Sequence, residues 1–265
     1  MANQHGDFVW YELLTKDVDA AARFYGAVIG WQERPAEGSD RGYRLFAIRG
    51  EDVGGLMALP DGAEGAGMRP IWLGYVGVDD VDATAAEIVR DGGVQHMPPA
   101  DIPGVGRFAM LADPQGVTFY VMRGAVDGTS NAFDQSQFGH CNWNELSTSD
   151  PAAALAFYTA RFGWTKGDAM PMGAMGDYQF IDHGGRTIGA VMRRTPDGPP
   201  PAWTFYFGVE DIDGAAQAVS GNGGTIHYGP AEVPGGAFII VASDPQGALF
   251  GLVGPRKSSS SEVSP

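Results

Sequence analysis

The sequence has one cysteine, no long apolar run and far fewer basic than acidic residues. With Cys141 as the single cysteine among 265 residues, neither an intramolecular disulfide nor a zinc site built from several cysteines is possible. No apolar stretch approaches the roughly 18 residues that a membrane-spanning helix requires. The N-terminal segment MANQHGDF lacks the basic start and apolar centre of a secretion signal. We therefore expect a cytoplasmic protein.

The shortage of positive charge limits the classes of partner. Lys and Arg number 17 against 32 Asp and Glu, which gives a formal net charge of −15 at pH 7. A uniformly acidic surface repels phosphate backbones and anionic lipid headgroups, so we expect neither nucleic acid nor a membrane as a partner. Hydrophobic residues make up 44% of the chain, which is enough to build buried cores.

An internal repeat dominates the sequence. The stretch WYELLTKD at 10–17 returns as WNELSTSD at 143–150, and ADPQGVTFYV at 112–121 returns as SDPQGALFGL at 243–252. Self-similarity that spans half the chain indicates a structural unit that is present twice.

The repeat predicts two tandem domains, at 6–124 and at 138–254. The segment 125–137 is polar and rich in turn-forming residues, so it is the expected linker. The Ser-rich end, 255–265, has no apolar periodicity and is expected to be disordered.

Each domain itself contains two halves, and each half reads as a strand, a helix and further strands. In the first half, Asp17 follows the strand FVWYELLT and can cap a helix over 19–30 that ends at Gly30. In the second half, a strand over 72–78 precedes a helix over 81–93 and a hairpin that turns at DPQG. The pattern predicts four βαβββ units and an α+β fold.

Three stretches carry a resemblance to a known family. They are DVDAAARFYGAVIGW, the VDDVDA segment that begins the second helix, and the DPQG turn. Together they resemble the vicinal oxygen chelate superfamily, which includes glyoxalase I, bleomycin-resistance proteins and extradiol dioxygenases. The tandem form with W-x-E-L-x-T-x-D is similar to an actinobacterial subgroup of these proteins. The resemblance implies that two βαβββ units curl into one open cup, with the ligand inside and the helices outside.

The resemblance also implies where a metal ion would be held. Metal-dependent members use His, Glu or Gln from four strands that line the cup. The corresponding positions here are Trp10, Met57, Leu73 and Tyr120 in the first domain, and Trp143, Met192, Thr204 and Gly251 in the second. Because these residues are not usual metal ligands, we expect no metal and no other cofactor. Glyoxalase I and extradiol chemistry are disfavoured, since both need the ion; a metal lyase with atypical ligands remains an alternative.

The repeated Trp-x-Glu suggests the polar part of the site. Strand alternation places Trp10 and Glu12 on one face, and the resemblance implies that this face looks into the cup. Trp143 and Glu145 occupy the same places in the second domain. Three roles remain open for each glutamate: a general acid or base with a raised pKa, an anchor for a cationic or hydroxylated ligand, or a structural carboxylate bonded to a neighbouring Arg or Tyr.

Aromatic side chains would supply most of the contact area for a ligand. The expected catalytic candidates are Glu145 and Glu12, and the expected ligand-binding residues are Trp143, Thr204, Tyr206, Met192, Gly251, Trp10, Tyr75, Tyr120 and Met57. Smaller residues at matched positions predict that the second cup is the roomier one. The Met-rich stretch 170–178 is either a ligand-moulding loop or a plain surface hairpin.

The leading hypothesis is a metal-independent small-molecule-binding protein for an apolar, aromatic or reactive metabolite, acting in sequestration, detoxification or metabolite tailoring. The main alternative is an enzyme that uses Glu145 or Glu12 as general acid or base. The protein is expected to be a monomer or a homodimer, and the sequence does not distinguish the two.

Overall fold

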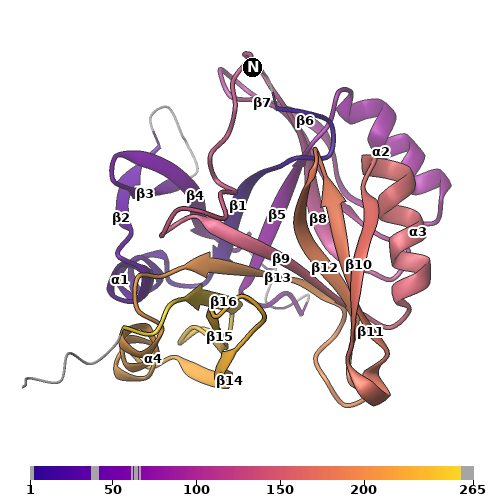
Figure 1. The fold of residues 1–265 in the computed structure, drawn as a ribbon. Coiled ribbons are helices and arrows are strands. Elements are labelled where there is room, and N and C mark those ends of the chain that lie inside the picture. Colours follow the sequence, from indigo (N-terminus) through magenta and orange to yellow (C-terminus); the bar gives the residue numbers. More distant parts are fainter. Residues whose placement is uncertain (1–2, 37–41, 61, 63–64, 66, 258–265) are drawn as a thin grey trace, which may run out of the picture.

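The chain forms two eight-stranded sheets over residues 3–36, 42–60, 62, 65 and 67–257, the part described by this computed structural model (Figure 1). The first domain contains, in chain order, β1 (Phe8–Thr15), α1 (Val18–Ile29), β2 (Gln32–Pro35), β3 (Arg44–Ile48), β4 (Glu51–Ala58), β5 (Ile71–Gly77), α2 (Val81–Arg90), β6 (Val94–Ile102), β7 (Gly106–Ala112) and β8 (Thr118–Gly124).

The second domain repeats this series and adds one short 3-10 helix. It contains β9 (Cys141–Thr148), α3 (Pro151–Phe162), β10 (Thr165–Pro171), the 3-10 helix η1 (Gly173–Met175), β11 (Asp177–His183), β12 (Arg186–Arg193), β13 (Ala202–Gly208), α4 (Ile212–Gly221), β14 (Thr225–Glu232), β15 (Phe238–Ser243) and β16 (Leu249–Gly254). Of the tail predicted to be disordered, the part from residue 258 onward lies outside the described residues.

The strand order is the same in both sheets. The first sheet runs β2-β3-β4-β1-β5-β8-β7-β6, and the second runs β10-β11-β12-β9-β13-β16-β15-β14. The first strands of the two βαβββ units therefore lie side by side and antiparallel at the centre, β1 against β5 and β9 against β13. Both sheets are open and strongly curved (Figure 1). The predicted α+β fold with tandem cups is confirmed. No helix in the described part of the chain is long and apolar enough to cross a membrane.

Helix α1 illustrates how local sequence sets the elements. The Asp17 side chain accepts a hydrogen bond from the Ala20 backbone N–H, as expected of a helix-capping carboxylate. The helix ends at Gly30, whose φ of 89° is the left-handed conformation that glycine adopts without strain. Its buried side consists of Ala21, Phe24, Tyr25 and Val28.

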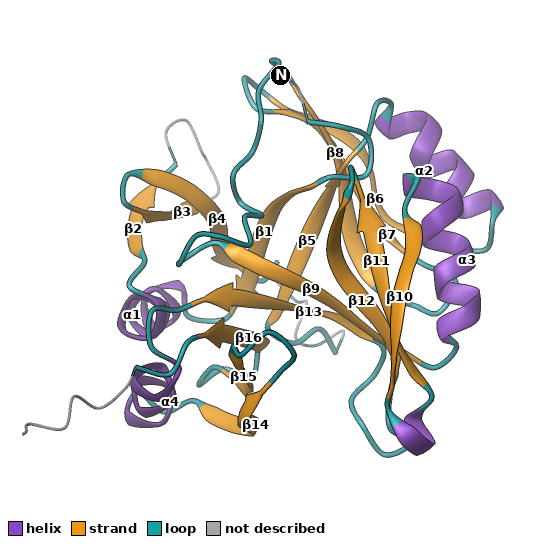
Figure 2. Cartoon of the chain, in the orientation of Figure 1, coloured by secondary structure: helices purple, strands orange, loops and turns teal. Residues whose placement is uncertain are grey.

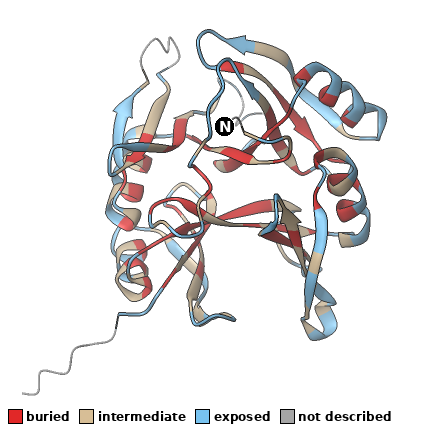
Figure 3. Cartoon of the chain, turned by 45° about the horizontal axis from the view of Figure 1, so that its top comes forward, coloured by how far each residue is buried: buried red, intermediate tan, exposed pale blue. Residues whose placement is uncertain are grey.

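The helices flank the sheets in two pairs, each with one helix from either domain. Helix α1 lies beside α4, and α2 lies beside α3 (Figure 2). In the second pair, Arg161 of α3 forms ion pairs with Glu87 and Asp91 at the C-terminal end of α2. The side of each sheet that faces its helices also faces the other domain, so one apolar core runs through both domains (Figure 3). We call the opposite, concave side of each sheet its cup.

Matching positions of the two domains meet at the centre of this shared core. The Tyr11 hydroxyl donates to Oδ1 of Asn144, the residue that stands in the equivalent place of β9, at 2.8 Å. Gly74 of β5 meets its own counterpart, Phe205 of β13, and a Cβ at Gly74 would lie 2.8 Å from the Phe205 ring. A large residue thus faces a small one at both points, so the interface fits two unlike domains.

The DPQG turns join the domains at their rims. Gln115 accepts hydrogen bonds from Thr148, Ser149 and the Asp150 backbone, all of the second domain. Gln246 makes the reciprocal bonds to the Asp17 backbone of the first domain. The motif predicted as a hairpin turn therefore also holds the start of the other domain's first helix.

Candidate functional site

The cup of the first domain is closed by its own side chains. Leu14, Leu73, Tyr75, Tyr120 and Met110 are buried there, in a cluster separate from the core shared by the two domains. Partly buried residues pack against this cluster; they are Trp10, Met57, Leu59, Ile71, Met97, Phe108 and Met122. The first cup is thus a second small core.

Glu12 lies within this packing and is only 3% exposed. The Tyr75 hydroxyl donates to its Oε2 at 2.9 Å, and the hydroxyls of Tyr43 and Tyr120 also bond its carboxylate. The indole Nε1 of Trp10 donates in turn to the Tyr43 hydroxyl at 2.8 Å. Three phenols therefore satisfy one buried carboxylate, and a tyrosine bridges the two residues of the Trp-x-Glu motif.

The second domain repeats the arrangement with fewer tyrosines. Tyr178 donates to Oε2 of Glu145 at 2.7 Å, and Tyr206 donates to Oε1 at 3.1 Å. Trp143 donates from its indole to the Tyr178 hydroxyl at 2.8 Å, as Trp10 does to Tyr43. Glu145 is half-buried, unlike Glu12. The tryptophan, glutamate and bridging tyrosine thus form the same unit in both cups.

The bridging tyrosines, Tyr43 and Tyr178, are the site residues that sequence reasoning missed. Tyr43 lies immediately before β3, and Tyr178 lies in β11. In each sheet, that strand is two places away from the strand that carries the glutamate. A signal for them exists: the segments GYRLF and DYQFI place a tyrosine at matching points of the repeat. Nothing in that spacing says that the tyrosine reaches the glutamate.

Burial shapes the electrostatics of both clusters. Removal from water raises the pKa of Glu12 above its ordinary value, and the hydrogen bonds from its tyrosines oppose the rise. Burial raises the pKa of Glu145 too, again opposed by its tyrosine donors. The pKa values of Tyr75 and Tyr206 are also raised, first by burial and then by the neighbouring carboxylate. The phenols therefore stay protonated and act as hydrogen-bond donors. This agrees with one of the three roles considered for each glutamate, that of a structural carboxylate bonded to a neighbouring tyrosine.

The two cups differ most at one matched pair, Tyr120 and Gly251. In the first cup the Tyr75 and Tyr120 rings stack, with centroids 4.2 Å apart and planes 15° apart. In the second, Gly251 sits beside Tyr206 in the same register, and the Tyr206 ring leans over it. A Cβ added at Gly251 would lie 2.3 Å from Cδ1 of Tyr206. The second cup thus has one phenol fewer, and its remaining ring occupies part of the space.

Other matched positions also carry a smaller or more polar residue in the second cup. Thr204 stands where the first cup has Leu73, and Ser147 stands where it has Leu14. Met192 lies beside Ser147 as Met57 lies beside Leu14. The second cup is therefore lined by smaller and more polar groups. That its cavity is larger stays a prediction.

The donors that converge in the cups do not make a metal site. The described residues contain no group of three or more His, Cys, Asp or Glu side chains that could hold an ion. Each cup offers one carboxylate, and tyrosine hydroxyls already bond it. Divalent ions need several carboxylate, carbonyl or imidazole ligands together, so this donor set does not fit one.

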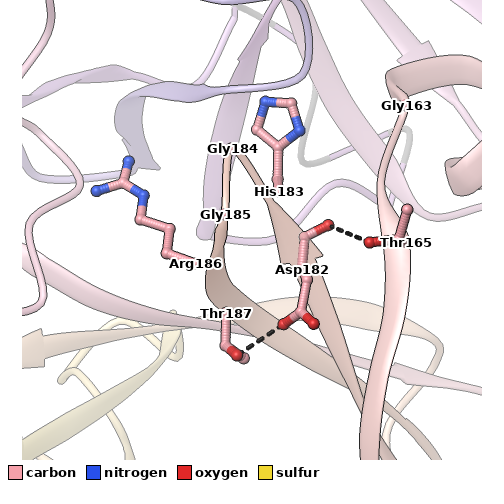
Figure 4. A pocket seen from close by; sticks show the side chains of 8 residues that line it. All are labelled: Gly163, Thr165, Asp182, His183, Gly184, Gly185, Arg186 and Thr187. Carbon is pink, nitrogen blue, oxygen red and sulfur yellow. Dashed lines mark hydrogen bonds between the residues drawn. The ribbon is translucent and has the colours of Figure 1, made fainter.

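A separate hollow lies beside the β11–β12 turn of the second domain. Gly163, Thr165 and the β11–β12 turn line it, and the Asp182 carboxylate in it accepts from the Thr187 hydroxyl (Figure 4). His183 of this turn lies 3.4 Å from the Asp7 carboxylate of the first domain. The bonds of Thr165, Thr187 and Asp182 brace the hairpin within the second domain, and the His183–Asp7 contact reaches the first domain. We therefore assign these groups a structural role.

The chain belongs to the Glyoxalase/Bleomycin resistance protein/Dioxygenase superfamily. The sequence profile of this superfamily matches twice, over residues 7–121 and 137–252. The resemblance drawn from the sequence motifs is thereby confirmed.

Two relatives match this chain over nearly their whole length. The chain is 36% identical over 248 residues to "Putative glyoxylase CFP32" of Mycobacterium tuberculosis, and the match covers 93% of this chain and 94% of that protein. It is 31% identical over 265 residues to the anthracycline biosynthesis protein DnrV of Streptomyces peucetius, covering 94% and 93%.

Solved structures of low sequence identity share the fold. The 2,3-dioxygenase LapB from Pseudomonas sp. KL28 superposes with a TM-score of 0.64 at 15% identity, over 99% of this chain and 97% of that one. The Mn(II)-bound glyoxalase from Novosphingobium aromaticivorans gives 0.63 at 20% identity, over 97% and 84%. At such identities the likeness concerns the fold alone.

Proposed function

We propose that the protein binds an apolar or aromatic small molecule in the cup of its second domain, without a metal ion. The observation that carries this proposal is the difference between two otherwise matching cups. The first is packed by its own side chains around Glu12, whereas the second keeps the polar unit but replaces its neighbours with Ser147, Thr204 and Gly251. A site with aromatic walls and a few fixed polar groups suits a small apolar ligand.

The donor set supports the metal-free part of the proposal. Trp143, Met192, Thr204 and Gly251 stand at the positions that the family resemblance implies for the ligands of metal-dependent members, and Glu145 is bonded by two tyrosines. A ligand would therefore be held by stacking and by hydrogen bonds rather than by oxygen atoms on an ion. The involvement of two similar proteins in anthracycline biosynthesis supports an aromatic metabolite as the class of ligand.

Ligand-induced thermal stabilisation tests this function. Purified protein is screened against apolar and aromatic metabolites, before and after exhaustive treatment with a chelator. We expect several aromatic compounds to raise the melting temperature equally in both preparations, because ligand that binds only the folded state stabilises it. Elemental analysis that finds a stoichiometric metal, together with loss of binding after chelation, would overturn the proposal.

A second candidate function is acid–base catalysis by Glu145. The raised pKa of this carboxyl favours it, because a general acid or base works best when its pKa lies near the working pH. Glu145→Gln keeps the shape of the side chain but cannot exchange a proton. If Glu145 is catalytic, this variant binds substrate with little change and loses turnover; if Glu145 only anchors a ligand, affinity falls instead.

A further inference from the structure

Tyr120 occupies the first cup in the way an aromatic ligand would. Its ring stacks on Tyr75, and its hydroxyl bonds the carboxylate of Glu12. It enters from the next strand, β8, whose register sets it directly beside Tyr75. Ring stacking and a hydroxyl aimed at a buried carboxylate are together the features of a phenol-binding subsite.

The second cup keeps this subsite without its tyrosine. Tyr206 and Glu145 stand where Tyr75 and Glu12 stand, whereas Gly251 replaces Tyr120. Within the described residues Glu145 has two phenol donors, Tyr178 and Tyr206. A carboxylate offers about four acceptor positions, so Glu145 can take a further hydroxyl.

The edge of the second cup also presents an aromatic ring to solvent. Tyr228 of β14 is 58% exposed. Its counterpart, Met97 of β6, packs against the filled first cup. Tyr228 pairs with Val241, and Val241 pairs with Gly251, so Tyr228 stands in the cross-strand row that contains Gly251 and Tyr206. Cross-strand partners share a face of the sheet, so an aromatic ligand over Tyr206 would lie on the same face as Tyr228.

We propose that the second cup binds a hydroxyaryl compound, with its ring against Tyr206 and its hydroxyl donating to Glu145. The ligand hydroxyl takes the acceptor position on the glutamate that Tyr120 uses in the first cup, and the ligand ring lies beyond the Tyr206 ring, which leans over Gly251. This inference rests on the proposed function and adds two things to it: the chemical group that the site recognises and the atom that recognises it. The Thr204 hydroxyl, in place of the Leu73 side chain, gives the same wall a second polar contact for a substituted ring.

The test uses pairs of probes that differ in one hydroxyl hydrogen. They are p-cresol with 4-methylanisole, and 2-naphthol with 2-methoxynaphthalene. Calorimetric titration of the full chain measures the affinity for each. We expect the hydroxyl compound to bind about tenfold more tightly than its methyl ether, since a hydrogen bond to a charged group is worth roughly that much. Both ethers are still expected to bind, through their rings.

Three variants locate the effect. Glu145→Gln should remove the preference for the hydroxyl compound, whereas Glu12→Gln, the same change in the filled cup, should retain it. Tyr228→Ala removes a solvent-exposed ring and therefore leaves folding intact. This variant should bind the hydroxyl compound and its ether equally less tightly. The affinity for each should fall by about threefold to tenfold, within the usual range for one aromatic contact.

The outcomes separate the two proposals. Equal affinity for both members of each pair, or a preference that survives Glu145→Gln, would overturn the hydroxyaryl inference while leaving ligand binding intact. If Glu12→Gln removes the preference for the hydroxyl compound, the ligand binds in the first cup, which contradicts the inference. If neither these probes nor a wider aromatic panel binds at all, the proposed function itself fails.

Discussion

The two domains carry the same Trp-Tyr-Glu unit but surround it differently. In the first, Leu14, Leu73 and Tyr120 close over Glu12. In the second, smaller residues leave Glu145 half-buried. The polar unit is therefore compatible with a filled cup, and its presence alone does not mark a ligand site. The second cup differs in the residues around the unit. Where the first cup has Leu14, Leu73 and Tyr120, the second has Ser, Thr and Gly.

The largest effect is expected from emptying the first cup. Tyr120→Ala removes a ring that is 5% exposed and leaves a cavity beside Tyr75, so the free energy of unfolding should fall by roughly 3–5 kcal/mol. Denaturant unfolding measures the loss. Addition of p-cresol, which has the shape of the deleted side chain, should recover part of it. A loss below about 1 kcal/mol would show that the first cup is not a packed core.

A reciprocal exchange compares the two cups more directly. Leu73→Thr places a hydroxyl in an apolar cluster and should cost about 2–3 kcal/mol of unfolding free energy. Thr204→Leu makes the opposite change in the cup that we infer to be open, and should cost less than about 1 kcal/mol. Urea denaturation of both variants beside the wild type gives the two values. Equal costs would mean that the cups are equally packed.

The pH dependence of stability should distinguish the two glutamates. Because burial raises the folded pKa of Glu12 above 4.5, the wild type loses stability as the pH rises from 4.5 through that pKa, where the buried carboxyl must ionise. Glu12→Gln cannot ionise, so its stability relative to the wild type should increase over this window. Glu145→Gln should show the same trend less strongly, because Glu145 is half-buried.

Unfolding free energies measured from pH 4 to pH 8 on all three proteins give the two differences. Subtracting the wild type cancels the titration of every other group. A difference that does not change with pH for Glu12→Gln would contradict the raised pKa.

The smallest effect is expected where the domains are alike. Gln115→Ala and Gln246→Ala each remove hydrogen bonds to the start of the other domain's first helix. Both side chains lie at the rim, so each change should cost about 1 kcal/mol, with no difference between them beyond experimental error. Thermal unfolding of the two variants checks this. A clear inequality would mean that the asymmetry extends beyond the cups to the interface.

Local sequence was sufficient to predict most of the fold. The capping role of Asp17 and the stop at Gly30 follow from contacts within one helix, and both are confirmed. The edge strands β2 and β6 did not stand out in the sequence, because most of their residues are exposed and show no apolar alternation. Their pairing depends on neighbouring strands rather than on their own composition.

The site was only partly predictable, for a similar reason. Alternation in β1 placed Trp10 and Glu12 on one face, which the Trp10–Tyr43–Glu12 hydrogen bonds agree with. The bridging tyrosine comes from a strand that is not adjacent, so its partner depends on the curvature of the sheet. The contacts of Tyr11 with Asn144 and of Gly74 with Phe205 depend on how two domains dock, and the sequence pattern contains no signal for that.

Binding stoichiometry tests the central claim most directly. Calorimetric titration of the metal-stripped wild type with 2-naphthol should give one site per chain, and Glu145→Gln should weaken that site. Two sites per chain would contradict the inference that the first cup is filled. Binding that requires an added divalent ion would contradict the metal-free account.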